Sequence, residues 1–185
     1  MENREVFHEE EEIIFPDNLT PEDIMLVKKQ CEIQSATSVD QISGFAMAYS
    51  RVKEIVSDEI FFKDIDAEKV EELIMELASI IEERNEKGFR KVPVTFKDGS
   101  KAIDAENVPR AISGLSQGVA SLLAEPDSED ERFNSTALYT DFEKIHPFED
   151  GNGRVGDLLW KILEAKKTGK WPEELPPNIF NEKRE

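Results

Sequence analysis

The stretch IHPFEDGNGRVGDLLW, residues 145–160, concentrates more reactive and loop-forming residues than any other part of the chain. A Gly-Asn-Gly triplet in front of a helix lets successive backbone N–H groups converge on an anion. Arg154 adds a planar fork of donors that suits phosphate oxygens. Asp150 supplies a carboxylate of the kind that Mg²⁺ accepts, and His146 supplies a base that works near neutral pH. The stretch therefore predicts a phosphate-handling site with a base and a metal ligand.

Two other interpretations of the glycines fail on context. GNGRVG satisfies the dinucleotide-binding pattern G-x-G-x-x-G, but that pattern follows a strand, and here a helical pattern and a polar turn come first. A P-loop is excluded because no Lys-Ser/Thr pair follows the second glycine. A glycine-rich helix start with a surface arginine would explain any single residue of the stretch. Five such residues at this spacing favour the phosphate site.

Composition limits the class of protein and its partners. The chain has 185 residues, of which 38% are hydrophobic, and this predicts one globular domain. A net charge of −18 repels nucleic acid and anionic membranes, so we expect neither as a partner. Cys31 is the single cysteine, no apolar stretch is long enough to span a bilayer, and the N-terminus lacks the apolar region of a signal peptide. These features predict a cytoplasmic protein.

The pattern along the chain predicts an acidic arm over residues 1–16 and one helical domain over residues 17–185. His8 falls in the arm, where a solvated side chain is the expected state. Apolar residues at helical spacing and N-capping residues predict six helices. They begin after Thr20, near Val39, after Asp66, after Asn107, near Phe133 and near Arg154, and the third and sixth are expected to end before Gly88 and Gly169.

One segment has the two-residue period of strands. Val92, Val94 and Phe96 alternate with other residues, and Asp98-Gly99 is typical of a tight hairpin turn. Pro93 lacks an N–H group, which predicts an edge strand. Because an isolated hairpin is marginally stable, we expect it to lie against the helices with one edge free. The predicted fold is mainly α with a single β-hairpin.

The residues HPFEDGNGR at 146–154 resemble the signature loop of the Fic family, H-x-F-x-D/E-G-N-G-R-x-x-R. With the flanking helices and the hairpin, the resemblance extends over about residues 40–165. It implies a Fic-type helical bundle in which the hairpin is a flap that docks the target protein.

The resemblance also implies roles and a reaction. His146 would deprotonate a target hydroxyl, Phe148 would anchor the loop, and Asp150 would bind Mg²⁺. The residues that would hold the nucleotide phosphates are Gly151, Asn152, Gly153 and Arg154, with the Asn152 side chain as an additional donor. The reaction would be transfer of AMP from ATP onto a Tyr, Thr or Ser hydroxyl of a target protein. The target would add a strand to the hairpin around residues 90–103.

The chain departs from the family pattern at one position, where Asp157 replaces the second arginine. On a helix Arg154, Asp157 and Lys161 share a face, which predicts an exposed ladder of ion pairs. A carboxylate there would weaken ATP binding, so another phosphate-linked donor, or a degenerate binding or regulatory module, stays open as an alternative. The S-x-x-x-E spacing of Ser79 and Glu83 matches part of the family's inhibitory motif. Arg84 then replaces its small residue, so we interpret the match as coincidence and expect that form of restraint to be absent.

Overall fold

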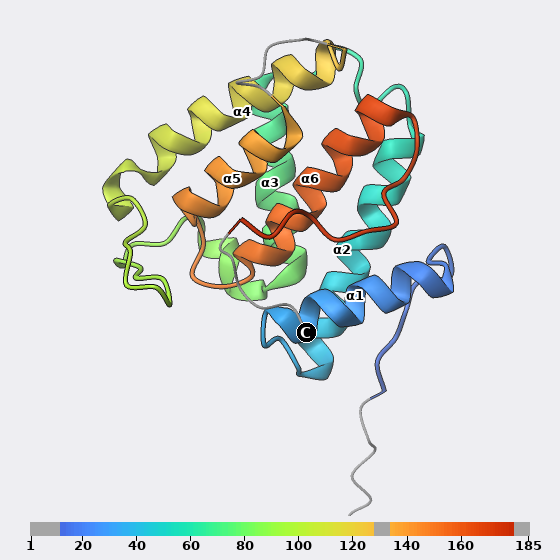
Figure 1. Ribbon diagram of the computed structural model, residues 1–185, viewed down its shortest axis with the longest axis horizontal. Coiled ribbons are helices and arrows are strands. Elements are labelled where there is room, and N and C mark those ends of the chain that lie inside the picture. Colours follow the sequence, from blue (N-terminus) through green and yellow to red (C-terminus); the bar gives the residue numbers. More distant parts are fainter. Residues whose placement is uncertain (1–11, 128–133, 180–185) are drawn as a thin grey trace, which may run out of the picture.

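The computed structural model describes residues 12–127 and 134–179, and this part of the chain is mainly α-helical (Figure 1). The elements are α1 (Pro21–Ile33), α2 (Val39–Ser57), α3 (Ala67–Ile81), α4 (Val108–Ala124), α5 (Ser135–Ile145) and α6 (Asn152–Thr168), with the 3₁₀ helices η1 (Glu83–Lys87) and η2 (Ala105–Asn107). The arm up to residue 11, which includes His8, lies outside the described residues, as does Phe133. The mainly α fold is confirmed, whereas the division at residue 16 stays a prediction.

Capping side chains explain where the first helices begin. The Thr20 hydroxyl accepts from the amide of Asp23, whose carboxylate accepts in return from the Thr20 amide. Asp66 caps α3 by accepting from the amide of Lys69 at 2.9 Å. The predicted end of that helix is wrong. α3 stops at Ile81, and Gly88, at φ +92°, closes the separate 3₁₀ helix η1.

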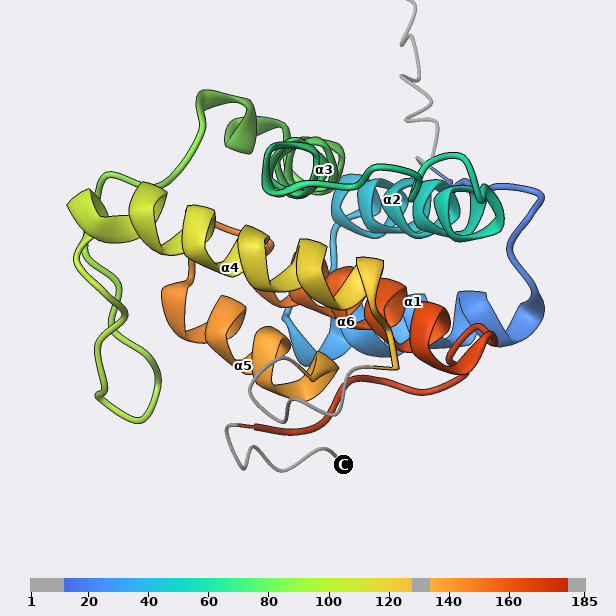
Figure 2. The ribbon, with the colours of Figure 1, turned by 90° about the horizontal axis from the view of Figure 1, so that it is seen from above.

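Helix α6 forms the centre of the bundle. It contacts α2, α3, α4 and α5, and in Figure 2 it lies between the α2–α3 pair and α5. Residues 152–163 are buried without interruption, including the predicted apolar stripe. Each buried Val, Leu or Ile contributes roughly 1.5–3 kcal/mol relative to an exposed one. The loop that precedes α6 is therefore attached to the most firmly packed element of the fold.

The hairpin is present as a turn but not as a pair of strands. Within the described residues, one isolated antiparallel bridge joins Thr95 to Lys101, and Gly99 turns the chain at φ +85°. The expected regular strands are wrong, and the tip of the loop projects away from the bundle (Figures 1 and 2). The expected contact with the helices is made at one point, where the Phe96 ring lies against the His146 ring. Pro93 cannot donate to a ladder, and the carbonyls of Val92 and Ile103 accept from Arg90 instead.

No helix within residues 12–127 and 134–179 combines the length and the apolar character that a membrane crossing requires.

Candidate functional site

Left-handed backbone at both ends positions the loop that joins α5 to α6. His146 ends α5 at φ +49°, and its amide donates to the Phe142 carbonyl at 3.0 Å. Gly151 begins α6 at φ +80°. A left-handed residue closes a helix well, but a histidine there is uncommon, and Asn is among the few side chains that tolerate the conformation. This limits which substitutions test His146 without straining the turn.

Phe148 and Asn152 close the loop from within. Phe148 is fully buried, and its ring packs 5.7 Å from that of Phe89. The Asn152 carboxamide accepts from the Phe148 amide and donates to the Phe148 carbonyl, both at 2.9 Å. These bonds satisfy backbone groups that burial removes from water. The Asn152 side chain, expected to face phosphate, therefore points into the loop and holds its shape.

Arg90 clamps the hairpin loop onto this turn. Its guanidinium is 2% exposed and donates only to main-chain carbonyls: Val92, Ile103, Ile145 and His146, at 2.6 to 3.1 Å. Its own amide donates to the Pro147 carbonyl at 2.8 Å. Sequence reasoning missed this residue because its acceptors are backbone atoms up to 56 positions away and carry no side-chain signal.

We expect Arg90→Met to destabilise the fold more than any neighbouring charge removal. The variant leaves four carbonyls without their donor, and hydrogen bonds to charged groups contribute about 1.5–3 kcal/mol each, so a loss of about 3 kcal/mol is expected. Lys91→Met removes the same charge at an exposed neighbouring position and should change the free energy of unfolding by less than about 0.5 kcal/mol. Urea denaturation measures both. Equal midpoints for the two variants would contradict the clamp.

His146 is half-buried, and the edge of its ring meets the Phe96 ring of the hairpin loop at 5.3 Å. Burial lowers the pKa of His146 from its ordinary value of 6.5. The positive charge of Arg90 acts in the same direction, while the Glu143 carbonyl and the Asp150 carboxylate oppose it. A histidine with a lowered pKa is neutral near pH 7 and can accept a proton.

This lowered pKa predicts how stability depends on pH. The unfolded chain binds the His146 proton near pH 6.5, and the folded chain binds it only at lower pH. The stability contributed by the neutral ring is therefore complete above pH 6.5 and is lost as pH falls through the folded pKa. Between about pH 7.5 and about pH 5.5, wild type should lose more unfolding free energy than His146→Asn. Urea denaturation at both pH values measures these losses. Equal losses of unfolding free energy in wild type and in His146→Asn would contradict the prediction.

Four charged side chains, Glu82, Arg84, Asp150 and Arg154, meet beside the loop, and we call them the arginine–carboxylate quartet. Arg154 is 1% exposed and contacts Glu82 at 2.8 Å and Asp150 at 3.5 Å. Arg84, from η1, contacts the same carboxylates at 3.7 and 3.4 Å. Glu83, the glutamate of the S-x-x-x-E match, is exposed. Its neighbour Glu82, which the sequence did not single out, occupies Arg154.

Side chains of other elements pack closely against Gly151 and Gly153. A Cβ at Gly153 would meet the Gln34 carboxamide oxygen at 2.2 Å, and one at Gly151 would meet Ile81 at 2.9 Å. The first amides of α6 have no acceptor within the helix, as at any helix N-terminus. Close packing therefore favours glycine at both positions, and the positive φ of Gly151 favours it further.

Asp150 is the residue of this site that suits a cation. Its side chain is 40% exposed, and one oxygen accepts from the Gly151 amide at 2.7 Å. The described residues include no group of three or more metal-ligating side chains. One carboxylate fits Mg²⁺ when phosphate oxygens and water complete the coordination shell.

Asp157 is buried and pairs with Lys161, so the expected ion pair is present but the expectation that the ladder is exposed is wrong. Its side chain is fully buried, with an oxygen 3.5 Å from the equally buried Lys161. Its negative charge raises the pKa of Tyr49 on α2, second to burial, and adds to the burial that raises the pKa of Cys31 on α1 to about 11. Because α6 is surrounded by other elements, this position is turned into the interior. Weakened ATP binding through Asp157 stays a prediction.

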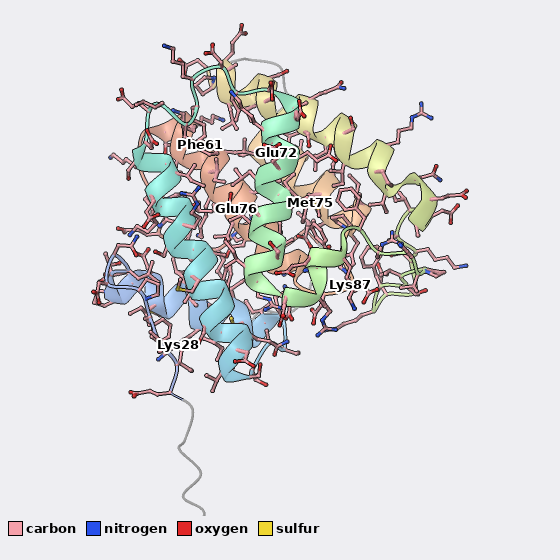
Figure 3. The ribbon with its side chains drawn as sticks, turned by 180° about the vertical axis from the view of Figure 1, so that it is seen from behind. Lys28, Phe61, Glu72, Met75, Glu76 and Lys87 are labelled. Carbon is pink, nitrogen blue, oxygen red and sulfur yellow. The ribbon has the colours of Figure 1, made fainter. Side chains whose placement is uncertain are left out.

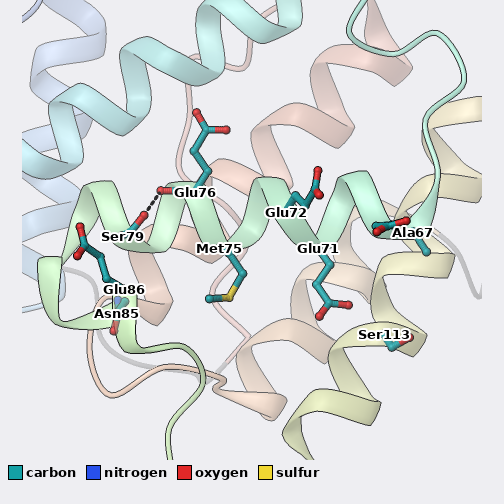
Figure 4. Close-up of a pocket in the computed structure, with 10 residues that line it drawn as sticks. Ala67, Glu71, Glu72, Met75, Glu76, Ser79, Asn85, Glu86 and Ser113 are labelled. Atoms are coloured by element: carbon teal, nitrogen blue, oxygen red, sulfur yellow. Dashed lines mark hydrogen bonds between the residues drawn. The ribbon is translucent and has the colours of Figure 1, made fainter.

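A hollow of about 850 Å³ lies elsewhere, along the outer face of α3. Glu72, Met75 and Glu76 stand on this face in Figure 3, and Figure 4 shows the further lining residues Glu71 and Glu86. No residue of the loop from 146 to 154 lines it. An acidic lining repels phosphates, so this hollow is not the nucleotide site.

Comparisons with known proteins agree with this geometry. A model of the Fic/DOC family matches residues 64–163, more than half of the chain. The fold is similar to the crystal structure of a Fic family protein from Desulfovibrio desulfuricans G20, with a TM-score of 0.54 and 21% identity. That similarity covers 82% of this chain and 52% of the other, so the chain spans about half the length of that protein. No curated protein matches the chain.

Proposed function

Because the chain belongs to the Fic/DOC family, we propose that it transfers AMP from ATP onto a Tyr, Thr or Ser hydroxyl of a target protein. One observation carries the proposal. A half-buried histidine with a lowered pKa precedes a glycine-started helix, and two guanidinium groups lie beside that helix start. These are the parts that phosphoryl-type transfer needs: a base, backbone donors and fixed positive charge.

The neutral ring of His146 takes the proton of the target hydroxyl, and the hydroxyl oxygen forms a bond to the α-phosphorus of ATP. The bond from that phosphorus to the bridging oxygen breaks, and pyrophosphate leaves with the electron pair. The amides of Gly151 to Gly153 hold the α-phosphate, and Arg154 holds the distal phosphates. Positioning and charge neutralisation account for most of the rate.

Asp150 is the residue proposed to hold Mg²⁺, with phosphate oxygens as further ligands. When bound, the ion neutralises charge on the phosphates of the leaving group. Arg84 and Arg154 contact the Asp150 carboxylate at 3.4 and 3.5 Å, and both contacts partly neutralise its charge.

The hairpin loop is the proposed docking place for the target. Its single bridge joins Thr95 to Lys101 and, within the described residues, no longer ladder extends it, and an extended target segment can pair with the backbone of such a short edge. Phe96 contacts the His146 ring, so a segment bound along this loop passes the proposed base. The buried Arg90 guanidinium bonds to both His146 and Val92 and so fixes the hairpin loop relative to the proposed base.

A different phosphate-linked donor, or a binding module without catalysis, would share the fold. The released product separates these possibilities. Incubation with ATP, Mg²⁺ and a cell lysate should release pyrophosphate in proportion to modified protein. Release of ADP above the level of lysate alone, with γ-phosphate fixed in protein, would mean phosphate transfer. Release of neither product above that level would mean that ATP is not the donor or that the module is not catalytic.

The ion pair between Glu82 and Arg154 predicts how ATP affinity is set. Glu82→Gln keeps the shape and the hydrogen bond from Gln41 but removes the charge that occupies the arginine. ATP affinity should rise about ten-fold, since charge-assisted contacts contribute about 1.5–3 kcal/mol. Glu83→Gln, at the exposed neighbouring position, should leave the affinity unchanged. Calorimetric titration measures both, and equal affinities for the two variants would exclude competition by Glu82.

A further inference from the structure

Arg84 and Arg154 hold the same two carboxylates from two different elements. Arg154 contacts one oxygen of Glu82 and one of Asp150, and Arg84 contacts the other oxygen of each. The two guanidinium groups therefore share the same pair of carboxylates. An anion that replaced the carboxylates would meet both cations.

The placement of Arg84 follows from how η1 is fixed. Asn85, which is 1% exposed, donates from one amide nitrogen to the Ala78 carbonyl at 3.1 Å and to the Asp150 carbonyl at 3.0 Å. These bonds tie η1 to the end of α3 and to the loop before α6, which lie side by side in Figure 1. Arg84 directly precedes Asn85. The hydrogen bonds of Asn85 therefore fix the backbone from which the Arg84 side chain extends to the loop.

The two arginines differ in exposure. The Arg154 side chain is 1% exposed and the Arg84 side chain is 51% exposed. An exposed ion pair contributes little to stability, so Arg84 can exchange a carboxylate for a phosphate at small cost. The second arginine position of the family loop holds the buried Asp157 in this chain and provides no cation to the site.

We propose that Arg84 is the second phosphate-binding cation of this site, contacting the distal phosphates of the nucleotide opposite Arg154. The inference rests on the proposed function, since it needs a nucleotide at the loop. Arg84 of η1 would then make the second contact to the distal phosphates, which position 157 of α6 does not provide. Planar guanidinium groups bind phosphate oxygens in pairs, which suits two arginines to one polyphosphate chain.

The test is a set of calorimetric titrations with ATP and with AMP, both with Mg²⁺, on the full chain. Arg84→Ala should weaken ATP binding about ten-fold, which corresponds to ~1.4 kcal/mol, and should change AMP binding less than about two-fold, because AMP has no distal phosphate. Arg84→Lys keeps the charge and should lose less than Arg84→Ala. Arg110→Ala, an exposed arginine at the start of α4, is the matched control and should bind ATP as wild type does.

The possible results distinguish a failure of the Arg84 inference from a failure of the proposed function. If wild type and Arg84→Ala bind ATP equally, or if Arg84→Ala weakens ATP and AMP to the same extent, Arg84 is only a surface ion-pair residue and this inference is overturned. If wild type and Glu82→Gln both fail to bind ATP, the proposed donor is overturned and the inference with it. The circular dichroism spectrum of Arg84→Ala should match wild type, because the residue is outside the core.

Discussion

His146→Asn should abolish AMP transfer while the fold is retained. General bases contribute about 10²- to 10⁴-fold to a rate, so a loss of at least about 100-fold is expected. Asn is chosen because His146 has φ +49°, a conformation that Asn adopts with less strain than Ala. Asn cannot take up a proton near neutral pH, so the substitution removes the base and leaves the turn.

The control for this prediction is the free energy of unfolding above pH 6.5, where the ring is neutral in both states. It should be within about 1 kcal/mol of wild type, which is an ordinary effect for a half-buried position. Retention of wild-type transfer by a folded His146→Asn protein would remove His146 from the chemistry.

The largest effect on stability is expected at Asp157. Asp157→Ala leaves the Lys161 ammonium buried without its carboxylate, and breaking a buried ion pair in this way typically costs about 3–5 kcal/mol. The Lys161 ammonium also donates to the Glu174 carbonyl and lies 5.7 Å from the centre of the Tyr49 ring. These contacts replace only part of the stabilisation that the Asp157 carboxylate gives to the Lys161 ammonium.

A double variant shows whether the effect comes from the charge. Asp157→Leu combined with Lys161→Leu replaces both charges by apolar groups, and such replacements are often close to neutral. The double variant should therefore be more stable than Asp157→Ala, and Asp141→Ala, at an exposed position on α5, should change little. If Asp157→Ala is as stable as Asp141→Ala, the buried ion pair does not hold the centre of the bundle together.

Local signals predicted the helices well because they act between neighbours in the chain. The caps at Thr20 and Asp66 and the apolar stripe from Val70 to Ile81 appear in the structure as expected. The loop from 146 to 154 carries its own turn chemistry, so its position between two helices also followed from the sequence. The hairpin did not form regular paired strands, because a two-stranded hairpin is stable only when it packs on another element, and the local pattern does not show whether it does.

Contacts distant in sequence explain what the pattern could not show. Asn85 meets Asp150 across 65 positions, and Arg154 meets Glu82 across 72. Charged residues carry no periodic signal for burial, so nothing in the pattern marked Arg90, and Asp157 was expected at the surface. A chain with 41 acidic and 23 basic side chains offers many equivalent pairings, and only the packing of α3, η1 and α6 selects the quartet.

The central claim, AMP transfer at the loop that joins α5 to α6, is tested most directly by following the two ends of ATP separately. Wild type and His146→Asn are incubated with Mg²⁺ and a cell lysate, once with α-labelled and once with γ-labelled ATP. Relative to lysate alone, wild type is expected to add α-label to protein and no γ-label, and His146→Asn is expected to add neither. Fixation of the γ-label alone, or equal fixation of the α-label by both proteins, would contradict it.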